Sequence, residues 1–274
     1  MNDINSALRP EIRDLPTIGR GARSAGLLPV QDYLQRFGYL PAGGYVRGSL
    51  DGDTGLGLAL FQSRLGLEVT GVFQPETRSA MAEERCGLPD LEDGLDAAIT
   101  CPWPAAALTF GFGVDGPDGS STEDARNAVR AAFTTWAEVV PAEVREASPG
   151  ETADVVVEWR PAADPDRSMV GGVVAHADWP GRCSVVTIAL PKPLHFDATE
   201  HTWAVGAVPG ALDIESIALH EVGHLLGLRH SSDRSAVMYP TVKVDFTART
   251  LRPDDLAAIR SLYPDDGRPR PRRS

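Results

Sequence analysis

The 274-residue sequence has few cysteines, a deficit of basic residues and no long apolar run. Three cysteines are too few for a disulfide framework to hold the fold. Acidic side chains outnumber basic ones 38 to 26, and the net charge of −12 argues against a nucleic-acid binder, since phosphate contacts need clustered Lys and Arg. No stretch approaches the roughly 18 apolar residues of a membrane span. The first twenty residues show no apolar signal-peptide core.

What the sequence does contain is a globular composition, 42% hydrophobic and 23% charged, long enough for two domains. Residues 1–25 show no periodicity, and we expect a flexible leader. Residues 26–90 carry three helical patterns separated by turns rich in Gly and Asp, which predict a small three-helix domain. A linker at 91–102 follows. We expect a second domain over 103–264 and a disordered, basic tail at 265–274.

The second domain mixes strand and helix patterns without regular alternation. Short β-branched or apolar runs predict strands at 108–112, 153–159, 172–175 and 184–190. Amphipathic patterns predict helices at 121–140, 212–226 and 254–262. This order favours an α+β fold over regular βαβ winding.

One helical segment contains the sequence HEVGHLLGLRH, from His220 to His230. Positions i and i+4 share a helix face, so His220 and His224 can present two imidazoles to one zinc ion. Glu221 is placed to take a proton from a water at the metal. Gly227 breaks the helix, so His230 can return as a third ligand. Three imidazoles leave a fourth position open, which is typical of catalytic zinc.

The extended pattern is specific. A bare HExxH string can arise by chance in a core helix, whereas the five-residue pattern has a chance expectation on the order of 10⁻⁵ in such a chain. Its spacing is that of the metzincin signature. The downstream string HSSDRSAVMYP, with Met238, Tyr239 and Pro240, resembles the matrixins, the matrix-metalloproteinase branch of the metzincins.

This resemblance implies a latent zinc endopeptidase with a twisted, mostly parallel sheet and three helices. It places a methionine, Met238, in a Met-turn beneath the zinc, and Tyr239 and Pro240 beside the S1′ pocket. Residues 251–263 resemble the family's last helix. The string ERCGLPD at 84–90 is similar to the family's cysteine switch, with Glu84 where the usual form has Pro.

The switch chemistry is direct, because a thiolate is a good fourth zinc ligand and excludes the attacking water. The resemblance therefore makes Cys86 a zinc ligand in the latent form and pairs Arg85 with Asp90. The alternative is an exposed cysteine at a domain boundary. The preceding three-helix unit resembles the peptidoglycan-binding-like fold of matrixin propeptides, and it is interpreted either as an inhibitory prodomain or as a cell-wall anchor.

The resemblance also implies further metal sites. It makes Asp164, Asp166, His176 and His195 ligands of a second, structural zinc: the family's upstream His and Asp fall on Asp164 and Asp166, so an aspartate stands where the family has a histidine. Solvated loop residues are the alternative. Asp197 and Glu200 match calcium ligands, but the aspartate of the family's DGPGG loop is missing, so we expect at most one calcium.

We therefore expect a monomeric zinc endopeptidase that acts on proteins or peptides and is inhibited by its own prodomain. The resemblance implies secretion, although no signal peptide is visible. Cys101 and Cys183 can pair in an oxidising compartment. The main alternative is a peptidoglycan-binding protein with a vestigial metallopeptidase unit; hydrolysis of another bond type is disfavoured by a strand at 172–175 suited to pairing with a peptide.

Overall fold

The computed structural model describes residues 9–91, 101–104, 106–114, 116, 122–181 and 189–264. The chain forms two compact units. The first comprises Met1–Glu84, Leu88–Ala98 and Val170–Gly172, and the second comprises Arg85–Gly87, Ile99–Met169 and Val173–Ser274. Among the described residues, no helix combines the length and apolar character needed to cross a membrane.

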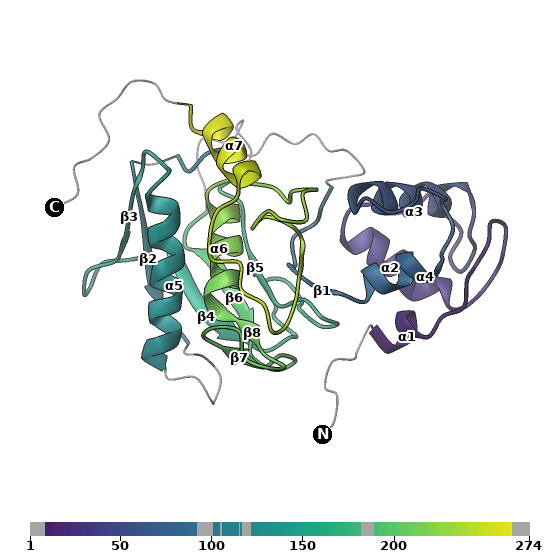
Figure 1. Cartoon of the computed structure of the whole chain (residues 1–274), viewed down its shortest axis with the longest axis horizontal. Coiled ribbons are helices and arrows are strands. Elements are labelled where there is room, and N and C mark those ends of the chain that lie inside the picture. The colour runs from purple at the N-terminus through teal and green to yellow at the C-terminus, as the bar shows by residue number, and fades with distance from the viewer. Residues whose placement is uncertain are drawn as a thin grey trace. The chain divides into compact units, whose positions relative to one another are not determined.

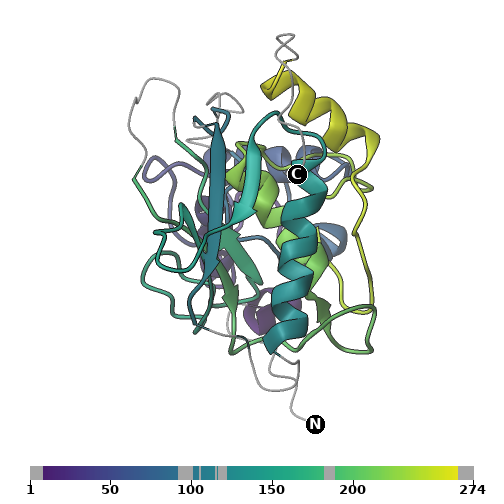
Figure 2. The ribbon, with the colours of Figure 1, turned by 90° about the vertical axis from the view of Figure 1, so that its left-hand side faces the viewer.

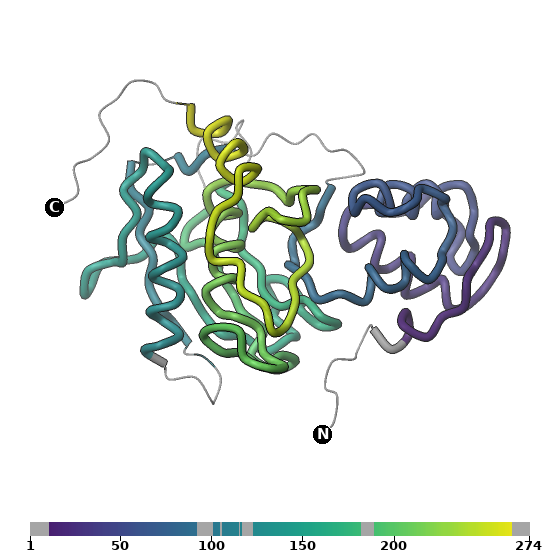
Figure 3. Tube along the Cα trace, in the orientation of Figure 1, coloured from purple at the N-terminus to yellow at the C-terminus, as the bar shows by residue number. Residues whose placement is uncertain are grey.

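The N-terminal unit is a small helical domain, which Figure 3 shows as the purple and blue part of the trace. Its helices are α1 (Arg9–Arg13), α2 (Leu27–Arg36), α3 (Gly52–Arg64) and α4 (Pro75–Met81). Local chemistry sets their starts. Asp51 caps α3 by accepting a hydrogen bond from the amide of Thr54, and Pro75 begins α4, where no amide donor is needed. Leu34, Phe61 and Phe73 are buried at its centre.

Part of the expected leader is structured, which differs from the sequence-based expectation for 1–25. The side chain of Ile12 in α1 is buried, and Ile18 forms a backbone bridge to Phe73. The guanidinium of Arg78 donates a hydrogen bond of 2.5 Å to the carbonyl of Leu15. Isolated apolar residues among Pro and charged residues give no periodic signal. The structure of this segment is therefore determined by its tertiary contacts and not by a local pattern.

The second unit is built on a five-stranded sheet. Its strands are β2 (Ala107–Phe112), β3 (Glu143–Glu146), β4 (Val155–Arg160), β5 (Ala175–Ala177) and β6 (Lys192–Asp197), in the order β3-β2-β4-β6-β5. All neighbouring strands are parallel except β5, which runs antiparallel to β6 at the edge. The predicted α+β class with a mostly parallel sheet is confirmed.

Two long helices cover one face of this sheet: α5 (Thr122–Ala137) and α6 (Ile214–Leu225). They pack against each other, as Figures 1 and 2 show in teal and green. The indole of Trp136, which is fully buried, donates a hydrogen bond of 2.7 Å to the carbonyl of Leu219. This bond fixes the position of α6 along α5. The helix α7 (Pro253–Leu262) follows near the C-terminus.

The strand predictions differ from the structure around the sheet edge. The edge strand β5 begins three residues after the expected start at 172, and most of the expected strand at 184–190 lies outside the described residues. Strand β6 was not expected, because Pro191 and Pro193 argue against a strand interior. The short strands are β1 (Glu84–Arg85), β7 (Trp203–Ala204), β8 (Leu212–Asp213) and β9 (Thr241–Val242).

Candidate active site and metal centres

Helix α6 holds the first two histidines of the motif. Asp213 caps this helix by accepting a hydrogen bond from the amide of Ser216. The helix ends at Leu225, and Gly227 adopts φ +98°, a conformation that L side chains rarely adopt. A Cβ at Gly227 would also lie 2.3 Å from the carbonyl oxygen of Cys101. The chain turns here and returns His230 toward α6.

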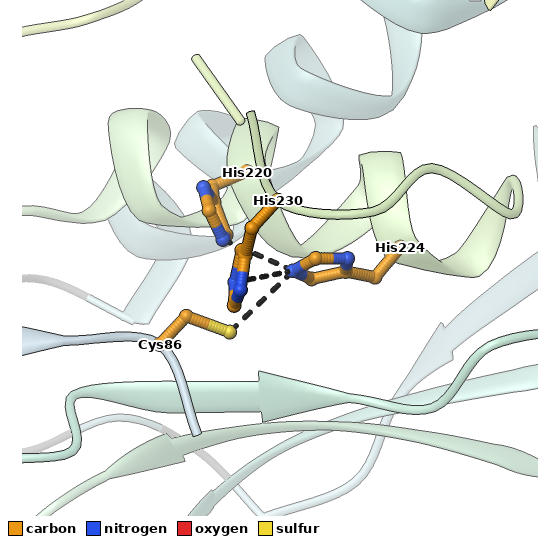
Figure 4. A group of neighbouring side chains, drawn as sticks. All are labelled: Cys86, His220, His224 and His230. Carbon is orange, nitrogen blue, oxygen red and sulfur yellow. Dashed lines mark hydrogen bonds between the residues drawn. The ribbon is translucent and has the colours of Figure 1, made fainter. Parts of the chain in front are cut away.

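The three histidines converge on one point, as Figure 4 shows. Nε2 of His224 lies 3.1 Å from Nε2 of His220 and 3.2 Å from Nε2 of His230. All three side chains are at most 4% exposed. Two imidazole nitrogens on a tetrahedral zinc, at about 2.0–2.1 Å each, are about 3.3 Å apart. The spacing of the cluster therefore matches a zinc site.

The protonation of these rings supports the same conclusion. Nδ1 of His220 lies 2.7 Å from the carbonyl oxygen of Val237, and Nδ1 of His224 lies 2.8 Å from that of Leu228. A carbonyl oxygen only accepts, so each Nδ1 carries the proton and each Nε2 presents a lone pair. Two lone pairs facing each other at 3.1 Å repel unless a cation lies between them. The donor set fits a metal ion.

A methionine turn supports the cluster from below. Met238 is buried, and a Cβ added at Gly223 of α6 would lie 2.3 Å from its Sδ atom, so only glycine leaves room for this packing. The buried carboxylate of Asp255 accepts hydrogen bonds from the amides of Val237 and Met238, at 2.9 and 3.0 Å. Helix α7 thereby fixes the turn that contains Val237 and Met238. The carbonyl of Val237 in this turn orients the ring of His220.

Glu221 is fully buried beside the histidines. Neither of its carboxylate oxygens makes a hydrogen bond of normal geometry to the described residues. Burial raises the pKa of Glu221 to about 8, against the opposing effect of the Cys86 thiol and the Ala177 backbone. Its place in the chain, one residue after His220, puts a proton acceptor beside the histidine cluster.

The Cys86 thiol completes the cluster. Its Sγ lies 3.5 Å from Nε2 of His224, and all four ligand atoms lie within 4.8 Å of one another. Sulfur and nitrogen on one tetrahedral zinc, at about 2.3 and 2.0–2.1 Å, are about 3.6 Å apart. The side chain of Cys86 is 1% exposed, so the alternative of an exposed boundary cysteine does not describe it.

Backbone pairing holds the segment Arg85–Gly87 against the walls of the site. The carbonyl of Arg85 accepts from the amide of Val174, and the amide of Gly87 donates to Ala175, both at 2.9 Å. On the other side, the amide of Cys86 donates to the carbonyl of Pro240 at 3.0 Å. A Cβ at Gly87 would lie 2.8 Å from the Val173 side chain, so this close approach requires glycine.

A second cluster joins three of the four residues predicted for a structural zinc. Oδ2 of Asp164 lies 2.6 Å from Nδ1 of His195 and 3.1 Å from Nε2 of His176. All three are at most 4% exposed, so they are not solvated loop residues. Burial lowers the pKa of His176, although its hydrogen bond to Asp164 opposes this shift, and the neutral imidazole is the metal-binding form. Asp166 lies outside this cluster: its side chain is 59% exposed, with Oδ2 3.8 Å from His195 Nδ1.

A third cluster contains Asp197 and Glu200, the residues matched to calcium ligands, together with His201. The sequence reasoning missed His201, although its i+4 spacing from Asp197 was a usable signal. It also missed Trp179, whose indole donates a hydrogen bond of 2.9 Å to the carbonyl of Leu228, the same carbonyl that orients His224.

Other expected features have mixed outcomes. Cys101 is disulfide-bonded, and Cys183 lies outside the described residues. The Asp90 carboxylate accepts a hydrogen bond of 2.6 Å from the Tyr39 hydroxyl within the N-terminal unit. Its expected ion pair with Arg85 stays a prediction.

Two buried histidines on a capped helix, a third returned by the turn at Gly227 and a glutamate beside them define the site of a zinc metalloendopeptidase. The matrixin family profile matches residues 102–264, and the profile of a putative peptidoglycan binding domain matches residues 23–81. The chain belongs to the matrixin family.

Its relatives include plant and animal peptidases. It is 33% identical to metalloendoproteinase 1-MMP of Arabidopsis thaliana over 89% of this chain and 70% of the relative. It is 31% identical to metalloendoproteinase 1 of Glycine max, over 89% of this chain and 83% of the relative. Neutrophil collagenase of Homo sapiens is 33% identical over 85% of this chain but 49% of its own length.

Proposed function

We propose that this matrixin is a latent endopeptidase in which Cys86 blocks the catalytic zinc until it is displaced. His220, His224 and His230 would hold the zinc through Nε2. The bound ion supplies a Lewis acid that polarises the peptide carbonyl and makes water more acidic. The observation that carries latency is the 3.5 Å separation between Cys86 Sγ and His224 Nε2 in a cluster spaced like a tetrahedral zinc site.

Glu221 would supply the proton transfers. Its carboxylate accepts a proton from the attacking water and then delivers it to the amide nitrogen of the leaving group. Glu221 is buried beside the histidine cluster, so the proton that it takes stays within the site until the leaving group receives it. The Val237 and Leu228 carbonyls keep Nδ1 of their histidines protonated throughout.

The substrate would be an extended peptide segment. Strand β5 lies at the sheet edge, and its Ala175 carbonyl is used by Gly87. A substrate strand can take the same backbone partners once the switch segment leaves. The switch therefore competes with substrate for the edge as well as for the metal.

Activity of the full-length, zinc-loaded protein on a quenched fluorescent peptide tests latency. We expect wild type to be nearly inactive and Cys86→Ser to be active before any cleavage, since a neutral hydroxyl is a poor zinc ligand beside a thiolate. Cys86→Ser combined with Glu221→Gln controls for a contaminating peptidase and should be inactive. Equal activity of wild type and Cys86→Ser before processing would overturn the proposal.

Asp164, His176 and His195 would hold a second zinc that fixes the loop before β5. Glu158 stands near this cluster, with Oε2 3.5 Å from Nε2 of His195 and a side chain 13% exposed. Asp164 faces the other ring nitrogen, Nδ1, so Glu158 would orient the imidazole from its far side rather than ligate the ion. This ion would brace the edge strand rather than react.

The protein would act as a monomer outside the cell. The disulfide-bonded state of Cys101 supports an oxidising compartment. The match of residues 23–81 to a putative peptidoglycan binding domain favours one further candidate, attachment to cell walls. Sedimentation of the Glu221→Gln protein with purified peptidoglycan tests it: retention of the full chain supports attachment, and its absence leaves inhibition as the role of this unit.

A further inference from the structure

Two carbonyl oxygens orient the histidine rings of α6, and each carbonyl lies in a loop. The carbonyl of Val237 accepts from Nδ1 of His220, and its turn is held by the carboxylate of Asp255. The carbonyl of Leu228 accepts from Nδ1 of His224 at 2.8 Å. Leu228 lies beyond the end of α6, so the helix itself does not fix this second carbonyl. Whatever holds it decides how firmly the ring of His224 is held.

The indole of Trp179 holds the Leu228 carbonyl. Its Nε1 donates a hydrogen bond of 2.9 Å to this oxygen, across 49 positions of the chain. A carbonyl oxygen has two lone pairs, so the indole N–H and the Nδ1–H of His224 can bond to it together. Leu228 is buried, which keeps water from replacing either donor easily. The carbonyl is therefore fixed by the indole while it fixes the imidazole.

Two ring contacts fix the indole in turn. The ring of Trp179 is perpendicular to that of His224, with the two centroids 6.0 Å apart. The guanidinium of Arg229 lies over the indole, with its Cζ atom 4.9 Å from the ring centroid, which makes a cation–π contact. Arg229 shares the peptide unit whose oxygen accepts from the indole. Trp179 therefore contacts both this peptide and the imidazole that the peptide orients.

The place of Trp179 in the chain joins the sheet edge to the histidine turn. Strand β5 ends at Ala177, and Trp179 follows two residues later. In the same strand, the carbonyl of Ala175 accepts from the amide of Gly87 in the switch segment. The hydrogen bond from Trp179 to Leu228 thus connects the edge that the switch segment occupies to the turn that follows α6.

We propose that Trp179 is a positioning residue for the catalytic metal. Its indole N–H holds the Leu228 carbonyl, which keeps the Nε2 lone pair of His224 aimed at the ion. Groups that orient a metal-binding histidine in this way typically contribute about 10–100-fold to metal affinity. The inference rests on zinc binding by His220, His224 and His230, as proposed above, and is independent of latency.

The rate at which zinc passes from full-length Cys86→Ser protein to excess chelator tests the proposal, counted for the ion that His224→Ala lacks. Trp179→Phe, added to this background, keeps an aromatic ring and removes the N–H donor. We expect it to release this ion at least roughly 10-fold faster. Trp159→Phe is the matched control, because the Trp159 indole nitrogen is buried without a hydrogen-bond partner among the described residues. Its release rate should equal that of the background protein.

The melting temperature of the metal-free proteins separates positioning from packing, since a packing role alone would lower it and leave zinc release unchanged. If Trp179→Phe does not fold, benzothienylalanine at position 179 removes the donor in nearly the same shape, because sulfur replaces the indole N–H. Equal release with and without the donor would overturn the proposal while zinc binding stands. A background protein with no zinc beyond that of His224→Ala would overturn both this proposal and zinc binding by the three histidines.

Discussion

Arg249 makes a two-pronged ion pair with Asp213, the residue that caps the histidine-bearing helix. Its Nε and Nη2 atoms lie 2.9 and 2.6 Å from the two carboxylate oxygens. Asp213 is 2% exposed and also accepts hydrogen bonds from Ser216. The segment after the Met-turn is thus tied to the start of α6, and helix capping and loop position depend on one carboxylate.

Replacing this carboxylate should destabilise the protein in a pH-dependent way. Burial alone would raise the pKa of Asp213, but hydrogen bonds from Arg249, Ser216 and the Gly206 amide lower it below 3.8. A lowered folded-state pKa gives stability that is present above the unfolded-state pKa and is lost as pH falls through the folded-state pKa. Asp213→Asn should therefore cost about 1–3 kcal/mol at pH 7.

Urea denaturation of metal-free wild type and Asp213→Asn, at pH 7 and at steps below pH 4, measures this cost. The difference in unfolding free energy should shrink as the wild-type carboxylate becomes protonated. Working without metal removes the contribution of the histidine ligands. A difference that is constant with pH would show that charge at Asp213 is not what stabilises the helix.

Gly223→Ala should destabilise the packing beneath the histidines. The new Cβ would meet Met238 Sδ at 2.3 Å and the Trp136 ring at 3.1 Å. Overpacking of this kind costs about 1–3 kcal/mol, which exceeds the gain in helix propensity of about 1 kcal/mol. Gly52→Ala is the matched control, because nothing lies within 4 Å of a Cβ at this first residue of α3. Thermal melts that rank Gly223→Ala at or above wild type would refute the packing account.

Glu221→Gln should keep zinc bound and lower peptide hydrolysis by at least roughly 100-fold, as expected for loss of general-base catalysis. The amide is close in size to the carboxylate, so the histidine cluster should persist. In a Cys86→Ser background, metal analysis measures zinc binding and hydrolysis rates measure the loss of proton transfer, so the two effects are separated. Near-full activity would remove Glu221 from the mechanism.

His176→Ala should lower the metal count by one and leave the zinc at His220, His224 and His230 in place. The lost imidazole is one of the three buried ligand-type groups Asp164, His176 and His195, and the two that remain are too few to hold the ion. Asp166→Ala offers a contrast, because that side chain is 59% exposed and should leave the count unchanged. An unaltered count in His176→Ala would show that this cluster binds no metal.

The sequence predicts best what local geometry decides. The spacing of His220 and His224 needs only helix periodicity, and a turn at Gly227 accounts for His230. The contact between Cys86 and His224 spans 138 positions, and no local pattern encodes it. It was predicted only because the string around Cys86 resembles a known switch.

The features that the sequence did not predict have physical causes as well. Strand β6 carries Pro193, which cannot donate to its neighbour, yet parallel pairing with β4 still forms around it. Asp164 and Asp166 are alike in sequence, and only burial separates them. His201 was missed because the resemblance assigned oxygen ligands there, although its spacing from Asp197 indicated proximity.

Cobalt substitution tests ligation by Cys86 most directly. Thiolate ligation to Co²⁺ produces an intense near-ultraviolet charge-transfer absorption, which nitrogen and oxygen ligands do not give, since the soft sulfur donates charge readily. Full-length wild type loaded with cobalt should show this band. Cys86→Ser should bind the same amount of cobalt without it, and His224→Ala should lose both the ion and the band. Wild type that holds cobalt at His220, His224 and His230 but lacks the band would contradict the account.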